Sequence, residues 1–385
     1  MYNTKQICHK PFFREPEFLL DIFHAISGQV FNTPFEIKQI KSASVFPEIA
    51  SDSDKHVLYW DIQYWNFFDS FLLELSYLLE NNLYLNNFID RVCAIYFDYL
   101  SLKLLHIPSL AYCIQVTRER WFGSETAYFS PNILGEYQMI GGVFWNNTYL
   151  TRLLVFNHEL FHLYFQLNPD KKLADYGRLN RLADLYMDGI KVDNEEDQML
   201  FEGLQQLQRS DLDKFLEEAA CDYRALLQTV AIQNHIDSES EKILALHVQE
   251  IHDAFHINQT FLSNLCSISL CWEAVYRAYI STNTDEEVLK MVQPIFDRAS
   301  QTAAVRNLII PDFLDKLMMQ TYGVTSYVNI LDNSFVRSAF QKVMDKVMDV
   351  NFMIYAFKES IKLTKLPHYN PFELKDIVLS NAGYQ

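Results

Sequence analysis

The sequence predicts an α+β fold that is predominantly α-helical. Only 10 glycines and 11 prolines interrupt a chain of 385 residues that is rich in leucine, phenylalanine and tyrosine. Long stretches mix apolar and charged residues as amphipathic helices do, whereas a few short segments alternate as strands do. A chain of this length can bury a large core, and we expect one to three structural units.

The first of three predicted regions covers residues 1–106 and is expected to be mainly helical. Helices are predicted at residues 16–26, 62–80 and 85–105, with a short strand at residues 56–60. We expect this region to be a scaffold that packs on the rest of the protein.

The second region, residues 107–235, is predicted to contain short strands followed by a buried helix. Alternating residue types predict strands at residues 111–116, 126–129 and 138–145. Residues 149–167 are dominated by leucine, valine, phenylalanine and tyrosine, which predicts a helix. Asn-Thr before this stretch can cap a helix start, and Asn-Pro after it favours a helix end.

The most informative motif lies in that helix, where His158, Glu159 and His162 form the pattern H-E-x-x-H. Four positions apart on a helix, the two imidazoles project from one face and can hold one zinc ion. Glu159 lies beside that face, where it can reach a water on the metal and act as general base. In a buried helix these side chains need polar partners. A metal would satisfy all three. The alternative is that the histidines donate to backbone carbonyls and that Glu159 pairs with an arginine.

A related pattern, H-D-x-x-H, occurs at His252, Asp253 and His256. Residues 238–256 mix charged and apolar positions like an ordinary amphipathic helix. We therefore expect these histidines, with His247, to lie partly solvated on a helix surface. Asp253 is also a shorter and less usual base than glutamate.

A catalytic zinc ion normally has three protein ligands, and H-E-x-x-H supplies two. The extended pattern that adds a third histidine fails here, because its glycine position is Phe165 and its histidine position is Asn168. The third ligand must therefore come from another part of the chain.

Glu218 is the candidate for this third ligand, on a helix predicted from about residue 210 to 233. Asp222 follows it by four positions and shares its face, so it can orient a histidine that binds the metal. Glu217 is the competing ligand if the register differs by one residue. The small residues of this helix would let another helix approach closely: Ala219, Ala220 and Ala225.

Over about residues 140–230 the chain resembles the gluzincin zinc peptidases, in which H-E-x-x-H is followed on a later helix by E-x-x-A-D-x-x-A. The resemblance implies that His158, His162 and Glu218 bind zinc. It also implies that Glu159 is the catalytic base and that Asp222 orients a ligand. Cys221 stands where the family usually has alanine. It adds a candidate thiolate near the metal, although at three positions from Glu218 it is expected to point partly away.

The resemblance further implies a zincin-like core with a small sheet ahead of the H-E-x-x-H helix. In this clan an edge strand of the sheet pairs with the extended substrate. Residues 139–144 are the candidate edge, although Gly141-Gly142 can equally mark a bulge or turn. A further side chain usually stabilises the oxyanion. Tyr223 and Arg224 are expected to point away from the metal, which leaves four candidates: Tyr164, Tyr176, His235 and His247.

The rest of the chain is expected to be helical. Residues 168–209 are polar, with helices at 175–190 and 197–208 that would form a cleft wall or lid. The third region, residues 236–385, reads as amphipathic helices separated by breaks at residues 282–285, 310–312, 322–324 and 366–367.

Composition limits the kinds of partner that the protein can bind and the cellular compartment in which it is expected. A formal charge of −17 and a pI of about 5.0 argue against binding to nucleic acid or to anionic lipid. No run of 18 apolar residues occurs and the N-terminus has no apolar signal core, so no membrane span is expected. Six cysteines without a C-x-x-C pair predict a reduced, cytoplasmic protein.

Together these features predict a zinc-dependent metallopeptidase that cleaves a protein or peptide substrate with narrow specificity. Two other classes stay open: a helical interaction protein with a degenerate motif, and a zinc hydrolase of a non-peptide substrate. Zinc stoichiometry separates the first from the peptidase, and the shape of the cleft separates the second. The oligomeric state is not predicted.

Overall fold

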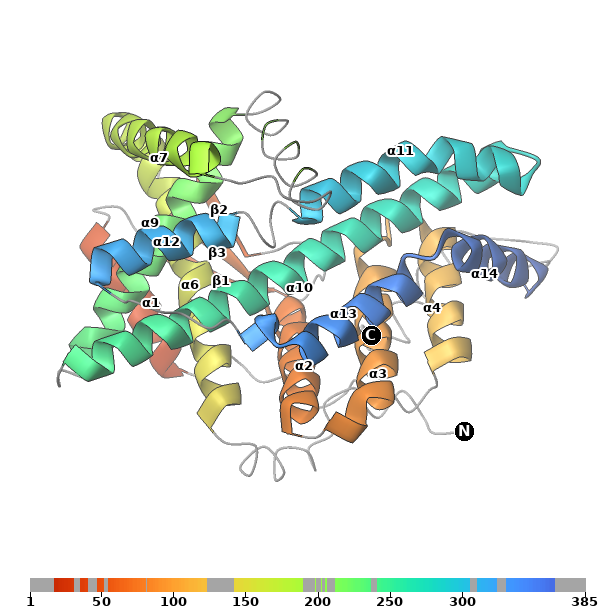
Figure 1. The fold of residues 1–385 in the computed structure, drawn as a ribbon, viewed down its shortest axis with the longest axis horizontal. Helices are drawn as coiled ribbons and strands as arrows, with labels where there is room; N and C mark the ends of the chain where they lie inside the picture. Colours follow the sequence, from red (N-terminus) through yellow and green to blue (C-terminus); the bar gives the residue numbers. More distant parts are fainter. Residues whose placement is uncertain are drawn as a thin grey trace.

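The described part of the chain is mostly helical and contains a small sheet ahead of the H-E-x-x-H helix (Figure 1). The computed structural model describes residues 17–30, 35–40, 47–51, 55–80, 82–122, 142–189, 198, 202, 205, 212–236, 241–304, 310–323 and 330–363. This confirms the predominantly helical α+β class. The elements of the N-terminal half are α1 (Glu17–Val30), β1 (Phe35–Ile40), β2 (Glu48–Ser51), β3 (His56–Asp61), α2 (Ile62–Glu80), η2 (Asn82–Tyr84), α3 (Leu85–Lys103) and α4 (Pro108–Phe122).

The remaining elements are all helices. They are α6 (Gly142–Leu167), α7 (Pro169–Gly189), α9 (Leu212–Ile236), α10 (Glu241–Ser281), α11 (Asp285–Ala304), α12 (Ile310–Tyr322), η4 (Ile330–Asp332), α13 (Ser334–Val347) and α14 (Val350–Leu363). The described part of the region from residue 236 onwards is thus a run of helices, as predicted. Among the described helices, none has the length and apolar character needed to cross a bilayer.

The sheet has the strand order β1-β3-β2, so β3 lies in the middle. β1 runs parallel to β3, with Phe35 opposite His56, and β2 runs antiparallel to it, with Glu48 opposite Tyr59. The predicted strand at residues 56–60 is confirmed as β3. Nearly all of β3 is buried, which explains why it stood out as an apolar run, whereas the more exposed β1 and β2 did not.

Two of the strands expected between residues 107 and 149 are wrong where the structure describes them. Residues 111–116 belong to α4, whose buried side chains follow a helical spacing at Leu110, Ala111, Cys113, Ile114 and Thr117. A six-residue window is too short to separate this spacing from alternation. Residues 142–145 form the start of α6, so the described part of the expected edge at 139–144 is helical. Residues 126–129 and 138–141 lie outside the described residues.

Other predicted helices are confirmed with shifted ends. The helix expected at residues 149–167 is α6, which starts seven residues earlier and ends at Leu167 as predicted. α7 begins at Pro169 rather than near residue 175, because proline is well suited to the first turn of a helix. Of the helix expected at 197–208, the structure describes residues 198, 202 and 205, and these are helical.

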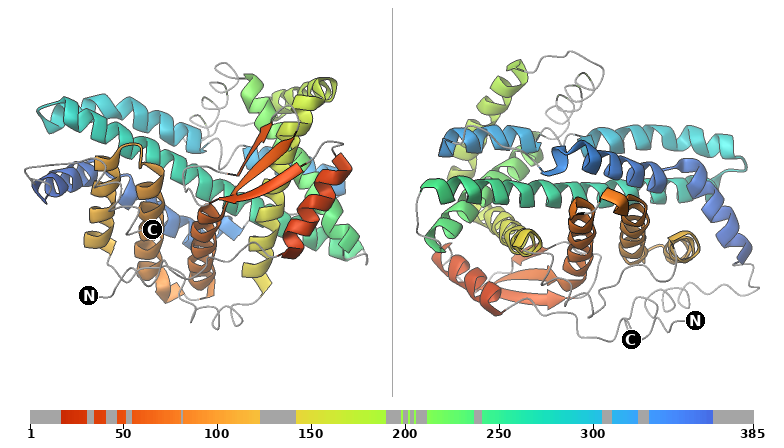
Figure 2. Two further views of the ribbon diagram at one scale, coloured as in Figure 1. Left: turned by 180° about the vertical axis from the view of Figure 1, so that it is seen from behind. Right: turned by 60° about the horizontal axis from the view of Figure 1, so that its bottom comes forward.

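The long helix α10 packs against helices from every part of the described chain. It spans 41 residues, and α11 runs back along it after a short turn (Figure 1). α2, α3 and α4 stand side by side against α10 (Figure 2). Tyr64 of α2 donates to Asn258 of α10 at 3.0 Å, and the Trp272 indole donates to the Val347 carbonyl at 2.9 Å. Gly323, with φ of 66°, ends α12 in the conformation that favours glycine.

α6 is fixed to the N-terminal elements by aromatic and ionic contacts. The rings of Phe156 and Phe23 stack with centroids 4.0 Å apart, which joins α6 to α1. Arg152 makes two 2.8 Å hydrogen bonds to Asp69 of α2 and lies over the Trp65 ring at 4.7 Å. Both partners of this ion pair are largely buried, at 8% and 16% side-chain exposure. The pair therefore sets the position of α6 on α2.

We predict that Asp69→Asn lowers the free energy of unfolding by about 3–5 kcal/mol, because it leaves the buried Arg152 guanidinium without its counter-charge. Urea denaturation of the purified variant measures this. Glu36→Gln is the control, because it removes an exposed ion pair with Lys55 and should cost less than about 1 kcal/mol. Similar losses in both variants would contradict the structural role given to Arg152.

Candidate metal centre

The predicted centre lies between α6 and α9, which pack closely along their length. α9 can approach because Ala219, Ala220 and Ala225 are small and almost fully buried, as their residue types suggested. The Asn157 amide donates to the Thr229 hydroxyl at 3.1 Å in this interface. This buried contact fixes the rotation of the two helices about their axes.

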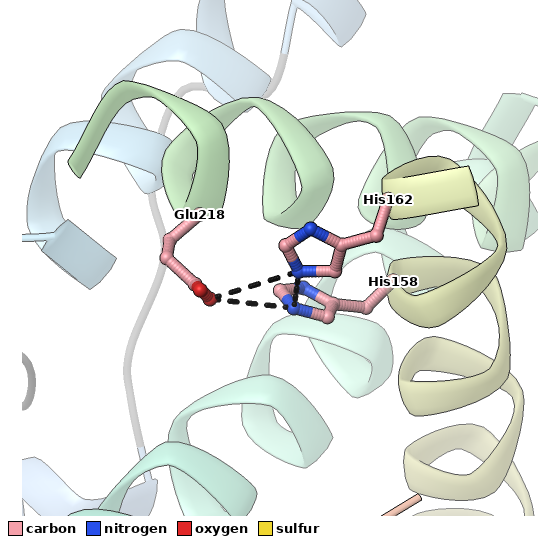
Figure 3. Close-up of side chains that lie close together, drawn as sticks. All are labelled: His158, His162 and Glu218. Atoms are coloured by element: carbon pink, nitrogen blue, oxygen red, sulfur yellow. Dashed lines mark hydrogen bonds and ion pairs between the residues drawn. The ribbon is translucent and has the colours of Figure 1, made fainter. Parts of the chain in front are cut away.

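His158 and His162 project from one face of α6 and meet Glu218 of α9 (Figure 3). The Nε2 atoms of the two histidines are 3.0 Å apart. The Glu218 Oε2 atom is 3.5 Å from Nε2 of His158 and 3.9 Å from Nε2 of His162. The structure therefore brings together the three residues that the sequence suggested as ligands.

The outer nitrogen of each ring faces a carboxylate of α9. Nδ1 of His158 is 2.7 Å from Asp222 Oδ1, and Nδ1 of His162 is 3.1 Å from Glu217 Oε1. In the neutral rings we assign the proton to Nδ1, where it is donated to these acceptors. Each Nε2 atom then carries a lone pair that points toward the Nε2 atom of the other histidine and toward Glu218.

Three electron-pair donors that converge in this way repel one another unless a cation lies between them. In the metal-free protein that cation is a proton. Burial opposes a charge on His158, but the contact with Asp222 outweighs it and holds the pKa of His158 well above its usual range. Burial and the charge on His158 lower the pKa of His162. Two imidazole nitrogens and one carboxylate oxygen are also a donor set that zinc accepts, with a fourth position left for water.

Glu217 takes the role of an orienting acid. One of its oxygens faces His162, and the other accepts from the Lys172 ammonium at 2.8 Å and from the Tyr176 hydroxyl at 3.2 Å. Burial raises the pKa of Glu217, but hydrogen bonds from Lys172 and His162 prevail and lower it. Glu218 rather than Glu217 thus faces both Nε2 atoms. Sequence reasoning missed this support, for which Lys172 and Tyr176, four positions apart on α7, were the available signal.

Glu159 sits beside the two histidines in a strongly acidic environment. Burial raises its pKa to about 7; His158 opposes this, and the negative charges of Glu218, Glu48 and Asp222 reinforce it. Glu48 is the first residue of β2, so the start of this strand lies near Glu159. β2 also packs against α6.

Cys221 does not supply the thiolate that its position suggested. Its side chain is fully buried. Burial, followed by the nearby carboxylates of α9 and Glu159, raises the pKa of Cys221 far above its usual range. The residue is therefore a neutral thiol in the core between the helices.

The candidates for a side chain that stabilises the oxyanion differ in what they contact. Tyr176 reaches the centre through Glu217. Tyr164 packs its ring against Phe161 and Phe165. As expected, Arg224 points away and makes two 2.8 Å bonds to Asp175 of α7, and Tyr223 is buried beneath Arg178. The side chains of His235 and His247 lie outside the described residues.

The expectation for the second motif is wrong. His252 and His256 are not on a solvated helix surface but are buried, at 1% and 7% exposure. α10 is covered here by α6, α9 and α12, whose packing against it was not visible in the local sequence pattern.

A comparison of the chain with known protein families, curated proteins and solved structures finds no match. The geometry of the centre is therefore the only support for the function proposed below.

We predict that Asp222→Asn weakens zinc binding about 10- to 100-fold, because the amide cannot hold the proton of His158 Nδ1 in the same way. Competition with a chelator of known affinity measures the change. Asp175→Asn is a matched control, because it also removes a carboxylate beside α9 but one that binds Arg224. Equal affinities of the Asp222 variant and the wild type would show that this contact does not orient a ligand.

Proposed function

We propose that the protein is a zinc-dependent metallopeptidase with a gluzincin-like, zincin-type catalytic core. The observation that carries this proposal is the convergence of His158 Nε2, His162 Nε2 and Glu218 Oε2, with carboxylates on the outer nitrogens of both rings. Separate helices supply the histidines and the three acids, so a chance property of one helix does not account for the arrangement.

His158, His162 and Glu218 would hold the ion, and Asp222 and Glu217 would fix the orientation of the two rings. A bound zinc ion lowers the pKa of a coordinated water and polarises a carbonyl group. The neutral Nδ1–H tautomer, fixed by the two carboxylates, leaves the Nε2 atoms as ligands. The three donors are partly exposed, at 17%, 27% and 37% for His158, His162 and Glu218, so a substrate can reach them.

Glu159 is the proposed general base. It adjoins His158 in the chain and lies on the same stretch of α6, next to the donors. It would take a proton from the attacking water and pass it to the departing amine. Burial raises the pKa of this carboxylate in the metal-free protein, which makes it a stronger proton acceptor than an exposed glutamate.

A peptide fits the site better than a compact substrate because a strand edge lies next to Glu159. Among the described strands, β2 is an outer strand of the sheet, and three of its four residues are exposed. An extended chain can add to such an edge through main-chain hydrogen bonds. β2 thus replaces residues 139–144 as the proposed substrate-binding edge.

The protein would act in the cytoplasm, on a protein or peptide substrate. The five cysteines among the described residues are all free thiols, which suits a reducing compartment. A protease that acts among cellular proteins needs narrow specificity, and we propose that this enzyme has it.

We predict that the purified wild type holds zinc, and that Glu218→Ala and His158→Ala each remove it from this centre, since two remaining donors bind zinc weakly. Elemental analysis with equilibrium dialysis measures this. Asp175→Asn serves as the control. Zinc binding that is unchanged in both ligand variants would reject this centre, whereas a wild type that holds no zinc would favour a metal-free interaction protein.

We predict that Glu159→Gln abolishes turnover and retains zinc, because the amide keeps the shape of the side chain but cannot accept the proton. Mass spectrometry of new N-termini, in cells that express the wild type or the variant, measures cleavage. A short set of new N-termini that only the wild type produces is the expected result. Zinc without any such cleavage would favour a non-peptide substrate, and cleavage of very many proteins would contradict narrow specificity.

A further inference from the structure

A second group of metal-binding side chains lies in the core, away from Glu159 and its neighbours. His252 and His256 are one turn apart on α10, and Asp315 comes from α12. All three are buried, at 1%, 7% and 7% exposure. The apolar residues beside them on α10 and α12 belong to one buried cluster: Ile251, Ala254, Phe255, Leu314, Leu317 and Met318.

The carboxylate of Asp315 lies between the two rings. Its Oδ1 atom contacts Nδ1 of His252, and its Oδ2 atom is 2.8 Å from Nε2 of His256. One ligand atom from each residue lies within 4.8 Å of the others. The plan repeats that of the first centre, in which two histidines one turn apart meet a carboxylate from another helix.

Asp253 does not belong to this cluster, although it stands between the two histidines in the sequence. Its Oδ1 atom accepts from the backbone N–H of Ile330 at 3.0 Å, and its Oδ2 atom accepts from Gln249 at 3.2 Å. It therefore holds η4 against α10 rather than acting as a base. Because both oxygens of Asp253 are engaged in these hydrogen bonds, the buried cluster is suited to structure rather than to catalysis.

The charge of Asp315 has to be balanced inside the core. With neutral imidazoles the cluster keeps a net negative charge in apolar surroundings, which is costly. A divalent cation balances the carboxylate and uses the lone pairs of both rings at the same time.

We propose that His252, His256 and Asp315 form a second, structural site for a divalent transition metal, with zinc as the first candidate. Two imidazole nitrogens and one carboxylate oxygen offer three converging donor atoms, of types that zinc accepts. Imidazole nitrogen with carboxylate oxygen favours zinc and its neighbours over calcium or magnesium. The site joins α12 to α10.

The second site also supports the first through α9. Leu314, Leu317 and Met318 of α12 lie in one buried cluster with Ala219 and Tyr223 of α9, which flank Glu218 and Asp222 in the chain. A metal that fixes α12 on α10 therefore also fixes the outer side of the helix that carries Glu218.

Metal counting in the full-length protein tests the proposal. We expect about two zinc ions per chain in the wild type, and about one in His158→Ala, which disables only the first centre. In that background, Asp315→Asn should remove the remaining ion, whereas Asp253→Asn should retain it. Titration with cobalt, followed by visible absorption, counts the same sites and needs no change at His252, His256 or Asp315.

The outcomes separate the two proposals. One ion in the wild type that persists in His158→Ala would uphold the second site and reject the first. If His158→Ala is folded by circular dichroism but takes up neither zinc nor cobalt, the second site is overturned. Protons on the histidines would then balance the charge of Asp315. If Asp315→Asn does not fold, the cobalt titration of His158→Ala still decides the question.

Discussion

The packing of α9 on α6 is the contact on which the metal centre depends, because neither helix carries a complete set of donors. α6 supplies two imidazoles, and α9 supplies the third donor and the acids that hold the rings. Small residues set the separation of the helices, and the bond from Asn157 to Thr229 sets their rotation. A rotation of α9 by one residue would bring Glu217 to the position that Glu218 occupies. Outside the interface, Lys172 and Tyr176 of α7 hold Glu217 in its place.

Negative charge is the second constraint on the site. Glu159, Glu217, Glu218 and Asp222 gather around two histidines, and burial makes this costly without a cation. Lys172 offsets one of these charges. Burial raises the pKa of Glu159, and the remaining excess of negative charge on Glu218, Glu48 and Asp222 raises it further. A divalent ion would relieve that excess, and the same reasoning applies to the buried carboxylate of Asp315.

The sheet reaches the centre from an unexpected part of the chain. Strands were expected directly before α6, but β1, β2 and β3 come from residues 35–61. The stacked rings of Phe23 and Phe156 and the pair of Arg152 with Asp69 bring this segment against α6. β2 of this segment also packs against α6. The N-terminal segment is therefore more than a helical scaffold.

Local patterns in the sequence were sufficient for most of the helices and for the residues of the first centre. Spacing along one helix determines which side chains share a face, and this suggested His158 and His162 together and Glu218 with Asp222. The central strand β3 was also visible, because its two buried faces leave a continuous apolar run. The strand expected at residues 111–116 failed because a short window fits both periods.

Only the tertiary structure decided which helices meet. It showed that Glu218 rather than Glu217 faces the histidines, that β2 lies beside Glu159, and that Cys221 is a buried thiol. It also showed that His252 and His256 are buried against Asp315, 59 residues after His256 in the chain. The reason is physical: periodicity reports which side of a helix a residue occupies. What covers that side depends on contacts between segments far apart in the chain.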